Sequence, residues 1–309
     1  MVDIAVLGSL NMDLVVTVPH LPRLGETIAG HGFQMIPGGK GANQAAAVAR
    51  LGGKVAMIGR VGADAFGESL RANLLRFGVN VEHVIVDEES ATGIAMILVD
   101  SMNGDNSIVI AAGANGQVSL KDLRRAEPLF RKAKMLILQF EVPLQVVERA
   151  AELARQHGLK VVLNPAPAYP VSLDFLLKAD YLILNETEIE ILSQHEVPGL
   201  ESAKVAAQAL VREGLPVVIV TSGERGALLA TSQEMVHVPA RKVQVVDTTA
   251  AGDAFVAGFT MGLLDGFPLD DAVRYAVCAG TLTVTKFGAQ TSLPSAEEVQ
   301  AFCEKDTAV

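Results

Sequence analysis

The chain has 309 residues, half of them hydrophobic and 19% charged, and its formal net charge is −10. This composition supplies ample apolar material for a large core, and it disfavours nucleic acid or an anionic membrane surface as a partner. No apolar run approaches the roughly 18 residues that span a bilayer, and no secretory signal is visible, so we expect a cytoplasmic protein without membrane association. The two cysteines, Cys278 and Cys303, match no metal-binding spacing, and we expect both to stay reduced.

Short apolar runs of strand length alternate with amphipathic helical stretches along most of the chain. Strands are expected at residues 3–8, 55–59, 134–140, 159–164, 180–185 and 216–221, and helices at 41–51, 66–77, 144–157 and 202–213. Residues 252–286 are predicted to be mostly helical. The alternation predicts an α/β fold, a three-layer α/β/α sandwich with a mostly parallel central sheet.

Two regions interrupt this alternation, residues 11–37 and 92–113. Both carry strand patterns, for example at 14–18, 93–99 and 107–110, without a long helix between them. We expect antiparallel strands that leave the main sheet as a small β-sheet lid. The chain shows no internal repeat or long linker, so residues 1–309 are predicted to form one domain that includes this lid.

The motif with the most specific chemistry is Asp247-Thr-Thr-Ala-Ala-Gly-Asp253, which precedes an apolar helical run. A strand pattern at 243–246 leads into it, and its small residues let the backbone approach a ligand closely. Backbone N–H groups at a helix N-terminus favour a phosphate, and Asp253 in the first turn can accept a proton from an attacking hydroxyl. An isolated Gly-Asp pair would only place an acid at a helix start, but the whole heptapeptide favours phosphoryl transfer.

Three further segments of the chain offer polar side chains that could bind a sugar. The glycine-rich run Gly38-Gly39-Lys40-Gly41-Ala42-Asn43-Gln44 precedes a helix, and its Lys40 and Asn43 side chains are suitable donors to hydroxyls. Asn11 and Asp13 follow the first predicted strand, at the end where open α/β sheets bind ligands, and Glu141 follows another strand. Each feature alone is also explained by a glycine turn, an Asx turn or a capped carboxylate.

Two further segments lie between a strand end and the next element. Asn185-Glu-Thr-Glu188 places carboxylates where they can hold Mg²⁺ through water, or where they simply complement a helix dipole. The run Thr221-Ser-Gly-Glu-Arg-Gly226 can receive a nucleotide or form an ordinary hairpin turn.

Taken together and in this order, the motifs resemble those of the ribokinase-like carbohydrate kinases over nearly the whole chain. Further segments that support the resemblance are Ala112-Gly-Ala-Asn115, Asn164-Pro-Ala-Pro167 and Lys286-Phe-Gly-Ala-Gln-Thr-Ser292. The resemblance implies the ribokinase-like sandwich with a β lid, a homodimer formed through the lid, and ATP-dependent phosphorylation of D-ribose at O5.

The resemblance also implies residue roles. Asp253 would be the catalytic base, and the anion hole would be formed by the backbone amides of Ala250, Ala251 and Gly252. The sugar would be held, together with Asp253, by Asn11, Asp13, Gly39, Lys40, Asn43 and Glu141. ATP would be held by Asn185, Thr221, Ser222, Gly223, Glu224, Arg225, Gly226, Gly252 and Val277. Mg²⁺ would have Glu188 in its outer shell, and K⁺ would lie among Asp247, Thr249, Thr283, Lys286, Gly288 and Ser292. Val277 and Lys286 depart from the residues common in relatives, which are His or Asn and Arg.

Other functions fit parts of this pattern. Another small sugar such as 2-deoxyribose suits the same donors, whereas a nucleoside needs a stacking surface that a chain with no Trp and three Tyr supplies poorly. A catalytically silent sugar-binding protein on the same fold is a further alternative, against which the intact Asp253 and Gly252 argue. A dinucleotide-dependent oxidoreductase would need a glycine fingerprint after the first strand, which is missing.

Overall fold

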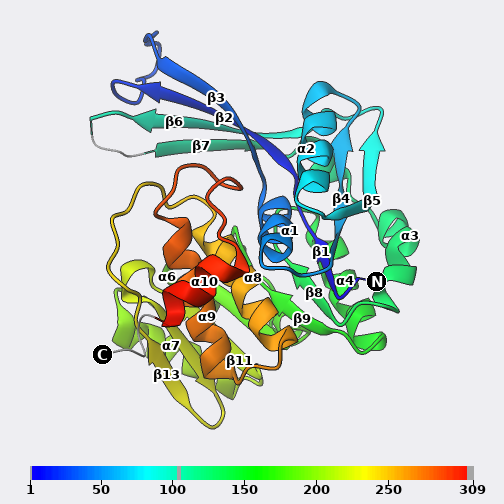
Figure 1. The fold of residues 1–309 in the computed structure, drawn as a ribbon, viewed down its shortest axis with the longest axis vertical. Helices are drawn as coiled ribbons and strands as arrows, with labels where there is room; N and C mark the ends of the chain where they lie inside the picture. Colours follow the sequence, from blue (N-terminus) through cyan, green and yellow to red (C-terminus); the bar gives the residue numbers. More distant parts are fainter. Residues whose placement is uncertain (1, 103–105, 305–309) are drawn as a thin grey trace.

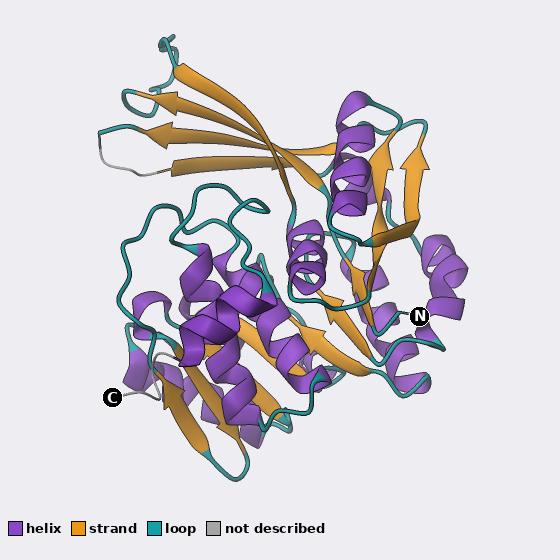
Figure 2. Ribbon diagram, viewed as in Figure 1, coloured by secondary structure: helices purple, strands orange, loops and turns teal. Residues whose placement is uncertain are grey.

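The computed structural model describes residues 2–102 and 106–304, which form a large and a small β-sheet with helices (Figures 1 and 2). The large sheet has the order β13-β12-β11-β10-β9-β8-β1-β4-β5. Its strands are β1 (Ile4–Leu7), β4 (Val55–Gly62), β5 (Asn80–Asp87), β8 (Met135–Leu138), β9 (Lys160–Leu163), β10 (Tyr181–Asn185), β11 (Val217–Thr221), β12 (Ala227–Thr231) and β13 (Met235–Val238). All neighbours from β5 to β11 pair in parallel, and β12 and β13 add an antiparallel edge. The predicted mostly parallel sheet is therefore confirmed.

Helices cover both faces of this sheet, because successive side chains of a buried strand point to opposite sides. In β1, Ile4 and Val6 join the core on one face, and Ala5 and Leu7 join the core on the other. The first face is covered by α1 (Lys40–Arg50), α2 (Ala65–Arg76), α8 (Ala251–Leu264), α9 (Leu269–Thr283) and α10 (Ala296–Glu304). The second is covered by α3 (Leu120–Phe130), α4 (Leu144–Gln156), α5 (Leu173–Leu176), α6 (Glu186–Ser193) and α7 (Leu200–Arg212). Two short 3₁₀ helices are η1 (Gly113–Gln117) and η2 (Gly223–Arg225).

The small sheet projects from the body as the predicted lid (Figure 1). Its order is β3-β2-β6-β7, with β2 (Asn11–Val18), β3 (His31–Gly38), β6 (Gly93–Asp100) and β7 (Asn106–Ala111). The prediction of antiparallel strands is wrong for the central pair, since β2 and β6 are parallel. Each of these two strands leaves the large sheet in the same direction, β2 after β1 and β6 after β5, and β3 and β7 return beside them. That residues 1–309 form one domain stays a prediction.

Two other expectations need correction. Residues 243–246 form an irregular segment instead of a strand, because no described strand pairs with them, and Val245 and Val246 are 59% and 56% exposed. The helical stretch 252–286 is divided into α8 and α9 by a turn that contains Gly266, with φ of 83°, and Pro268. Both residues favour a break in a helix.

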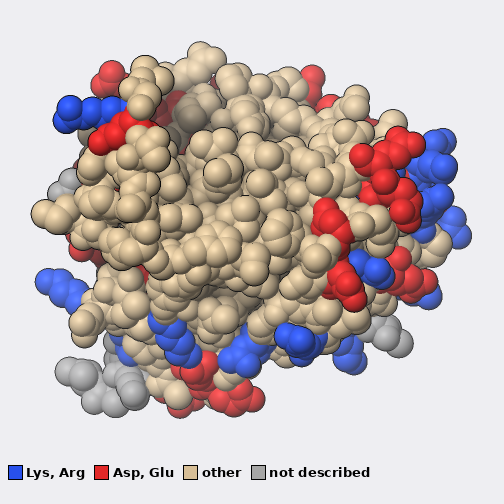
Figure 3. Space-filling model, turned by 90° about the horizontal axis from the view of Figure 1, so that it is seen from above, with Lys and Arg blue, Asp and Glu red and all other residues tan. Residues whose placement is uncertain are grey.

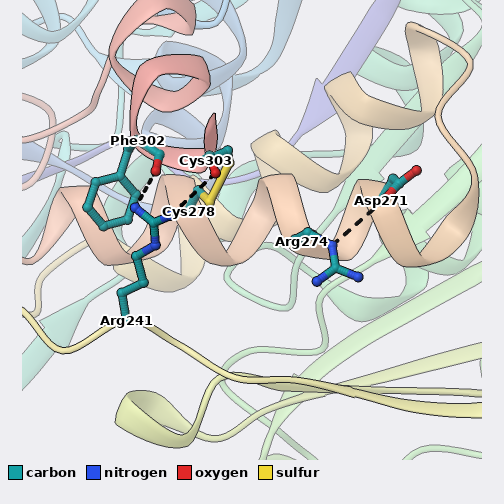
Figure 4. Close-up of a disulfide and its surroundings, with 6 residues drawn as sticks. All are labelled: Arg241, Asp271, Arg274, Cys278, Phe302 and Cys303. Carbon is teal, nitrogen blue, oxygen red and sulfur yellow. Dashed lines mark hydrogen bonds and ion pairs between the residues drawn. A yellow bond between two sulfur atoms is a disulfide. The ribbon is translucent and has the colours of Figure 1, made fainter. Parts of the chain in front are cut away.

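The cysteines form a disulfide between α9 and α10, so the expectation that both stay reduced is wrong for this structure (Figure 4). Cys278 and Cys303 are 25 residues apart in sequence, but α10 packs on α9 and brings their Cα atoms to 6.1 Å. The Arg241 guanidinium lies 4.6 Å from the centre of the Phe302 ring and donates hydrogen bonds to the carbonyl oxygens of Phe302 and Cys303. These contacts fix the last described helix to the body.

None of the helices in residues 2–102 and 106–304 combines the length and the apolar character that a bilayer crossing requires.

Candidate active site

Seven of the predicted site residues line one cavity, at the end of the large sheet where its parallel strands finish, whereas the other predicted residues lie outside its wall. The cavity has a volume of about 230 Å³, and the predicted residues on its wall are Lys40, Asn185, Glu188, Thr221, Ala250, Gly252 and Asp253. They come from separate parts of the chain, and the parallel sheet brings them together because its strands end at a common edge.

A second hollow of the same volume contains none of the predicted residues. Its charged groups are already paired within the chain: Lys160 lies 2.7 Å from Asp180, and Lys178 lies 2.6 Å from Glu148. Volume therefore does not distinguish the two hollows, whereas their chemistry does.

Asp253 is a buried carboxylate in the first turn of α8, with a relative exposure of 6%. Its Oδ2 accepts a hydrogen bond from Asn43 Nδ2, and its Oδ1 accepts one from Gln44 Nε2, both at 3.0 Å. Burial raises the pKa of Asp253, and the neighbouring Lys40 ammonium and the two amides oppose this shift. A carboxylate with a raised pKa that is fixed in orientation is suited to general base catalysis.

The backbone in front of Asp253 is shaped for an anion. Ala250 has φ of 61°, a left-handed conformation that costs a residue with a side chain about 1 kcal/mol and that is found at functional sites. A Cβ atom added to Gly252 would meet no protein atom within 4 Å, so space remains in front of this residue. The N-terminus of α8 therefore offers its N–H groups and its dipole to a ligand in the cavity.

Lys40 is the first residue of α1, and its ammonium interacts electrostatically with nearby carboxylates. Gly39 is the residue before the helix, with φ of 89°, and a Cβ there would come within 2.7 Å of the Asn11 backbone nitrogen. Glycine is thus required for the chain to turn into α1. Burial disfavours the charged Lys40 ammonium, but the carboxylates of Asp253, Glu141 and Glu188 outweigh it and raise the pKa of Lys40. The ammonium stays charged in a mostly acidic site.

Two further carboxylates, Glu141 and Asp13, interact electrostatically with Asp253. The Glu141 carboxylate accepts hydrogen bonds from the Ser9 hydroxyl and, at 3.1 Å, from the Lys40 backbone N–H. Asp13 lies in β2, and burial, together with the negative charges of Glu141 and Asp253, raises its pKa to about 7. No donor within residues 2–102 and 106–304 bonds to the Asp13 carboxylate. A half-buried carboxylate of this kind needs hydroxyl donors from a ligand.

Asn185 and Glu188 line the cavity where β10 ends and α6 begins. They form a capping box at the start of α6, in which each side chain accepts from the backbone N–H of the other at 2.8 Å. Burial raises the pKa of Glu188, against the opposing effects of the Asn185 N–H and of Lys40. The sequence left open whether the carboxylates of this segment hold a ligand or complement a helix dipole. Glu188 can do both, since one of its oxygens caps α6 while the residue also lines the cavity.

The segment from Thr221 to Gly226 follows β11 and contains η2. Thr221 lines the cavity, and the buried Ser222 hydroxyl has no hydrogen-bond partner within the described part of the chain. Arg225 is engaged by Glu186 at 2.6 Å. Val277 lies in α9 within the hydrophobic core and is not among the residues that line the cavity.

Only some of the residues predicted to hold a monovalent cation are linked to one another by hydrogen bonds. Asp247 Oδ2 accepts from the Gly288 N–H at 2.9 Å, and Asp247 Oδ1 accepts from the Thr249 N–H at 2.9 Å. Thr283 and Ser292 are buried, and their hydroxyls donate to nearby backbone carbonyls. The Lys286 ammonium instead pairs with Glu298 at 2.7 Å, so that Lys286 could contribute only its carbonyl.

Among residues 2–102 and 106–304, no group of three His, Cys, Asp or Glu side chains is arranged to hold a metal ion. One carboxylate with hydroxyls and carbonyls is nevertheless a suitable donor set for a hard monovalent cation, and Glu188 is suited to an outer-shell contact with Mg²⁺.

Several polar residues of the site were not predicted. Gln44 bonds Asp253 directly, Asn164 lines the cavity and accepts from Gln44 at 3.1 Å, and Gln290 donates to Asn43 at 3.1 Å. Asn115 is buried and bonds the Leu10 backbone and the Asn11 side chain, at distances from 2.7 to 3.0 Å. Asn164 ends a predicted strand, which was a usable signal, but no local pattern relates Gln290 to residue 43.

Known proteins resemble this chain in sequence and in fold. The model of the pfkB family of carbohydrate kinases matches residues 1–296. The chain belongs to the pfkB carbohydrate kinase family. A ribokinase from Haemophilus influenzae is 40% identical over 301 residues, covering 97% of this chain and 98% of that protein. A deoxyribokinase from Salmonella typhi is also 40% identical over 301 residues, with the same coverage of both proteins.

Solved structures of the pfkB carbohydrate kinase family share the architecture. The structure of Arabidopsis thaliana ribokinase complexed with ribose and ATP has a TM-score of 0.90 and 32% identity, and it covers 98% of this chain and 99% of that chain. The predicted ribokinase-like sandwich with a smaller sheet is therefore confirmed, as is the prediction that this chain is a sugar kinase.

Proposed function

We propose that this protein transfers the γ-phosphoryl group of ATP to O5 of D-ribose and releases D-ribose 5-phosphate and ADP. The observation that carries the proposal is the Asp253 carboxylate, buried at the N-terminus of α8 and held by two amides. It lines the same cavity as Lys40 and Gly252, where a hydroxyl and a phosphate can meet.

In the proposed reaction, Asp253 accepts the proton of the sugar hydroxyl as O5 attacks the γ-phosphorus. The new O–P bond forms while the bond from the γ-phosphorus to the bridging oxygen of ADP breaks. The negative charge of the transferred group is stabilised by the N–H groups of residues 250–252 and by the Lys40 ammonium. Phosphoryl transfer depends mostly on such positioning and charge stabilisation.

Asp13 supports ribose over 2-deoxyribose. Its carboxylate can accept two hydrogen bonds, and no donor within residues 2–102 and 106–304 bonds to it. The adjacent hydroxyls at C2 and C3 of ribose supply two donors, whereas 2-deoxyribose lacks one of them and leaves a half-buried acceptor unsatisfied. The relatives named ribokinase agree with this assignment, and the equally identical deoxyribokinase makes 2-deoxyribose the second candidate.

A catalytically silent sugar-binding protein would not need the arrangement around Asp253.

The nucleotide is proposed to lie between Asn185 and the segment from Thr221 to Gly226, where the Ser222 hydroxyl can be satisfied. Bound Mg²⁺ would neutralise phosphate charge, with Glu188 in its outer shell. K⁺ would be held by Asp247, by the hydroxyls or carbonyls of Thr249, Thr283 and Ser292, and by the carbonyls of Lys286 and Gly288. It would add positive field next to the anion hole of an acidic protein.

We also propose that the enzyme acts in the cytoplasm, where ATP is supplied.

The lid is proposed to form a homodimer interface. Strand register places Met35 of β3, Leu14 of β2, Met96 of β6 and Val109 of β7 in one row across the sheet. Met35, Met96 and Val109 are 57%, 53% and 63% exposed. A view from above shows a broad surface without charged side chains, and the charges gather near its edges (Figure 3). A contiguous apolar sheet face of this kind favours a second copy of the chain as its partner.

The test is ADP release with ATP, Mg²⁺ and K⁺ against ribose, 2-deoxyribose, fructose, fructose 6-phosphate and adenosine. A preference for ribose, with ribose 5-phosphate as product, supports the assignment. A preference for 2-deoxyribose transfers the assignment to the second candidate. Sugar binding without turnover would refute the kinase proposal.

A further inference from the structure

Both oxygens of the Asp253 carboxylate are held by amide side chains, and one of these amides ends a longer series. Behind Asn43, which donates to Oδ2, Gln290 Nε2 donates to Asn43 Oδ1 at 3.1 Å. Behind Gln290, Asn73 Nδ2 donates to Gln290 Oε1 at 2.6 Å. Three amides in series therefore connect helix α2 to the carboxylate.

The series has a fixed polarity. A primary amide donates from its nitrogen and accepts at its oxygen, and every amide in this series directs its N–H groups toward Asp253. If Asn43 turned over, its carbonyl oxygen would face the carboxylate, and its NH₂ group would face the NH₂ group of Gln290. Asn43 and Gln290 are only 6% and 3% exposed, so water cannot readily compensate for such contacts. Gln290 thus decides which end of Asn43 faces Asp253.

Gln290 also lies in a segment with a second attachment. It follows Gly288, whose N–H donates to Asp247 Oδ2 at 2.9 Å. The loop after α9 is therefore tied both to the start of the Asp247–Asp253 motif and, through Gln290, to Asn43 at the start of α1. A displacement of this loop would change the orientation of Asn43.

We propose that Gln290 is a positioning residue for phosphoryl transfer, which acts through Asn43 to hold the Asp253 carboxylate toward the substrate hydroxyl. The inference rests on the proposed role of Asp253 as the base. Gln290 itself is not among the residues that line the cavity. It makes the orientation of the base depend on the loop that carries Gly288 and Ser292.

Two replacements of similar size test the orientation. Gln290→Glu still accepts from Asn73 but has no N–H for Asn43, so Asn43 is expected to turn over and present its carbonyl oxygen to Asp253. Gln290→Met fills the same space without any hydrogen bond. We expect kcat per folded enzyme to fall by roughly 10- to 100-fold in Gln290→Glu and by less in Gln290→Met, with the KM for ATP within about twofold of the wild type. Gln233→Glu, in an exposed turn, controls for the added charge.

An orienting role of Gln290 and a role in packing alone predict different results. If both variants only lower the denaturation midpoint and kcat per folded enzyme is unchanged, Gln290 serves packing and the inference is wrong. If Gln290→Glu does not fold, Asn73→Ala removes the far donor of the series, and it should lower kcat in the same direction by a smaller factor. An unchanged kcat in that variant would equally overturn the inference.

A double-mutant cycle on stability supplies a readout that does not need activity. In an Asp253→Asn background, the neutral amide can offer either end to Asn43, so Gln290→Glu should lower the denaturation midpoint much less than it does with Asp253 present. Equal losses in the two backgrounds would overturn the inference. A wild-type protein that phosphorylates no sugar would instead refute the proposed function, and the cycle would still decide the role of Gln290.

Discussion

Asp13 is expected to reduce the stability of the unliganded enzyme at the pH where the enzyme works. Its pKa is raised from 3.8 to about 7, first by burial and then by the charges of Glu141 and Asp253. The folded protein therefore keeps a proton that the unfolded chain releases between about pH 4 and pH 7. The contribution of Asp13 to stability therefore falls as pH rises through this window, and it levels off above it.

The size of the effect follows from the shift. Each pKa unit corresponds to about 1.4 kcal/mol, so a shift from 3.8 to about 7 amounts to about 4 kcal/mol above pH 7. Asp13→Asn removes the charge but keeps a polar group that still lacks a protein partner, and this offsets part of the gain. We expect Asp13→Asn to be more stable than the wild type by about 1–3 kcal/mol at pH 8 and nearly equal to it at pH 4.

The assay is denaturant unfolding of the unliganded wild type and Asp13→Asn at several values between pH 4 and pH 8, with the exposed Asp174→Asn as a control for lost charge. The same variant should raise the KM for ribose about 10- to 100-fold, since hydrogen bonds to a charged acceptor are lost. A stability difference that does not change with pH would refute the electrostatic reasoning. An unchanged KM would place the sugar elsewhere.

Four other perturbations test separate parts of the proposal. Asp253→Asn should bind ribose and ATP but lose turnover by several orders of magnitude in a coupled ADP assay, and near-normal turnover would exclude it as the base. Replacing K⁺ with Na⁺ or a bulky organic cation should lower kcat, whereas indifference would exclude the monovalent cation site. Met96→Glu should convert a dimer to monomers in light scattering, and an unchanged mass would exclude the lid interface. Reducing the bond between Cys278 and Cys303, which are 25 residues apart, should lower the free energy of unfolding by about 3 kcal/mol, and an equal unfolding curve with and without reductant would contradict the disulfide.

The sequence predicted most of the fold because its strands are buried and their apolar runs are continuous. Strand β1 and helix α1 appear within a few residues of their expected positions. The parallel pairing of β2 with β6 could not be predicted in this way, since register between distant strands leaves no local pattern. The disulfide was missed for the same reason, because it depends on how α10 packs on α9.

The residues of the candidate site differ in the same way in how far the sequence alone could predict them. Asp253, Lys40 and Asp13 occur in short motifs whose glycines, strand ends and helix starts are visible in one stretch of sequence. Gln290 lies in the segment 286–292 that supports the family resemblance, but its proposed role depends on a contact with Asn43 across 247 residues of chain. The residues proposed to touch the ligand stand in local motifs, whereas the proposed orienting role of Gln290 becomes visible only in three dimensions.

The charges of the cavity explain why such orienting amides are needed. Burial at this site disfavours charged side chains. Four carboxylates nevertheless interact electrostatically with one another or with the Lys40 ammonium, those of Asp13, Glu141, Glu188 and Asp253. A single ammonium cannot satisfy all of these carboxylates, and additional lysines would trap the phosphorylated product by charge attraction. Neutral amides stabilise the Asp253 carboxylate without adding a fixed positive charge. In the proposed complex, the remaining positive field would arrive with the nucleotide, as Mg²⁺ bound to ATP.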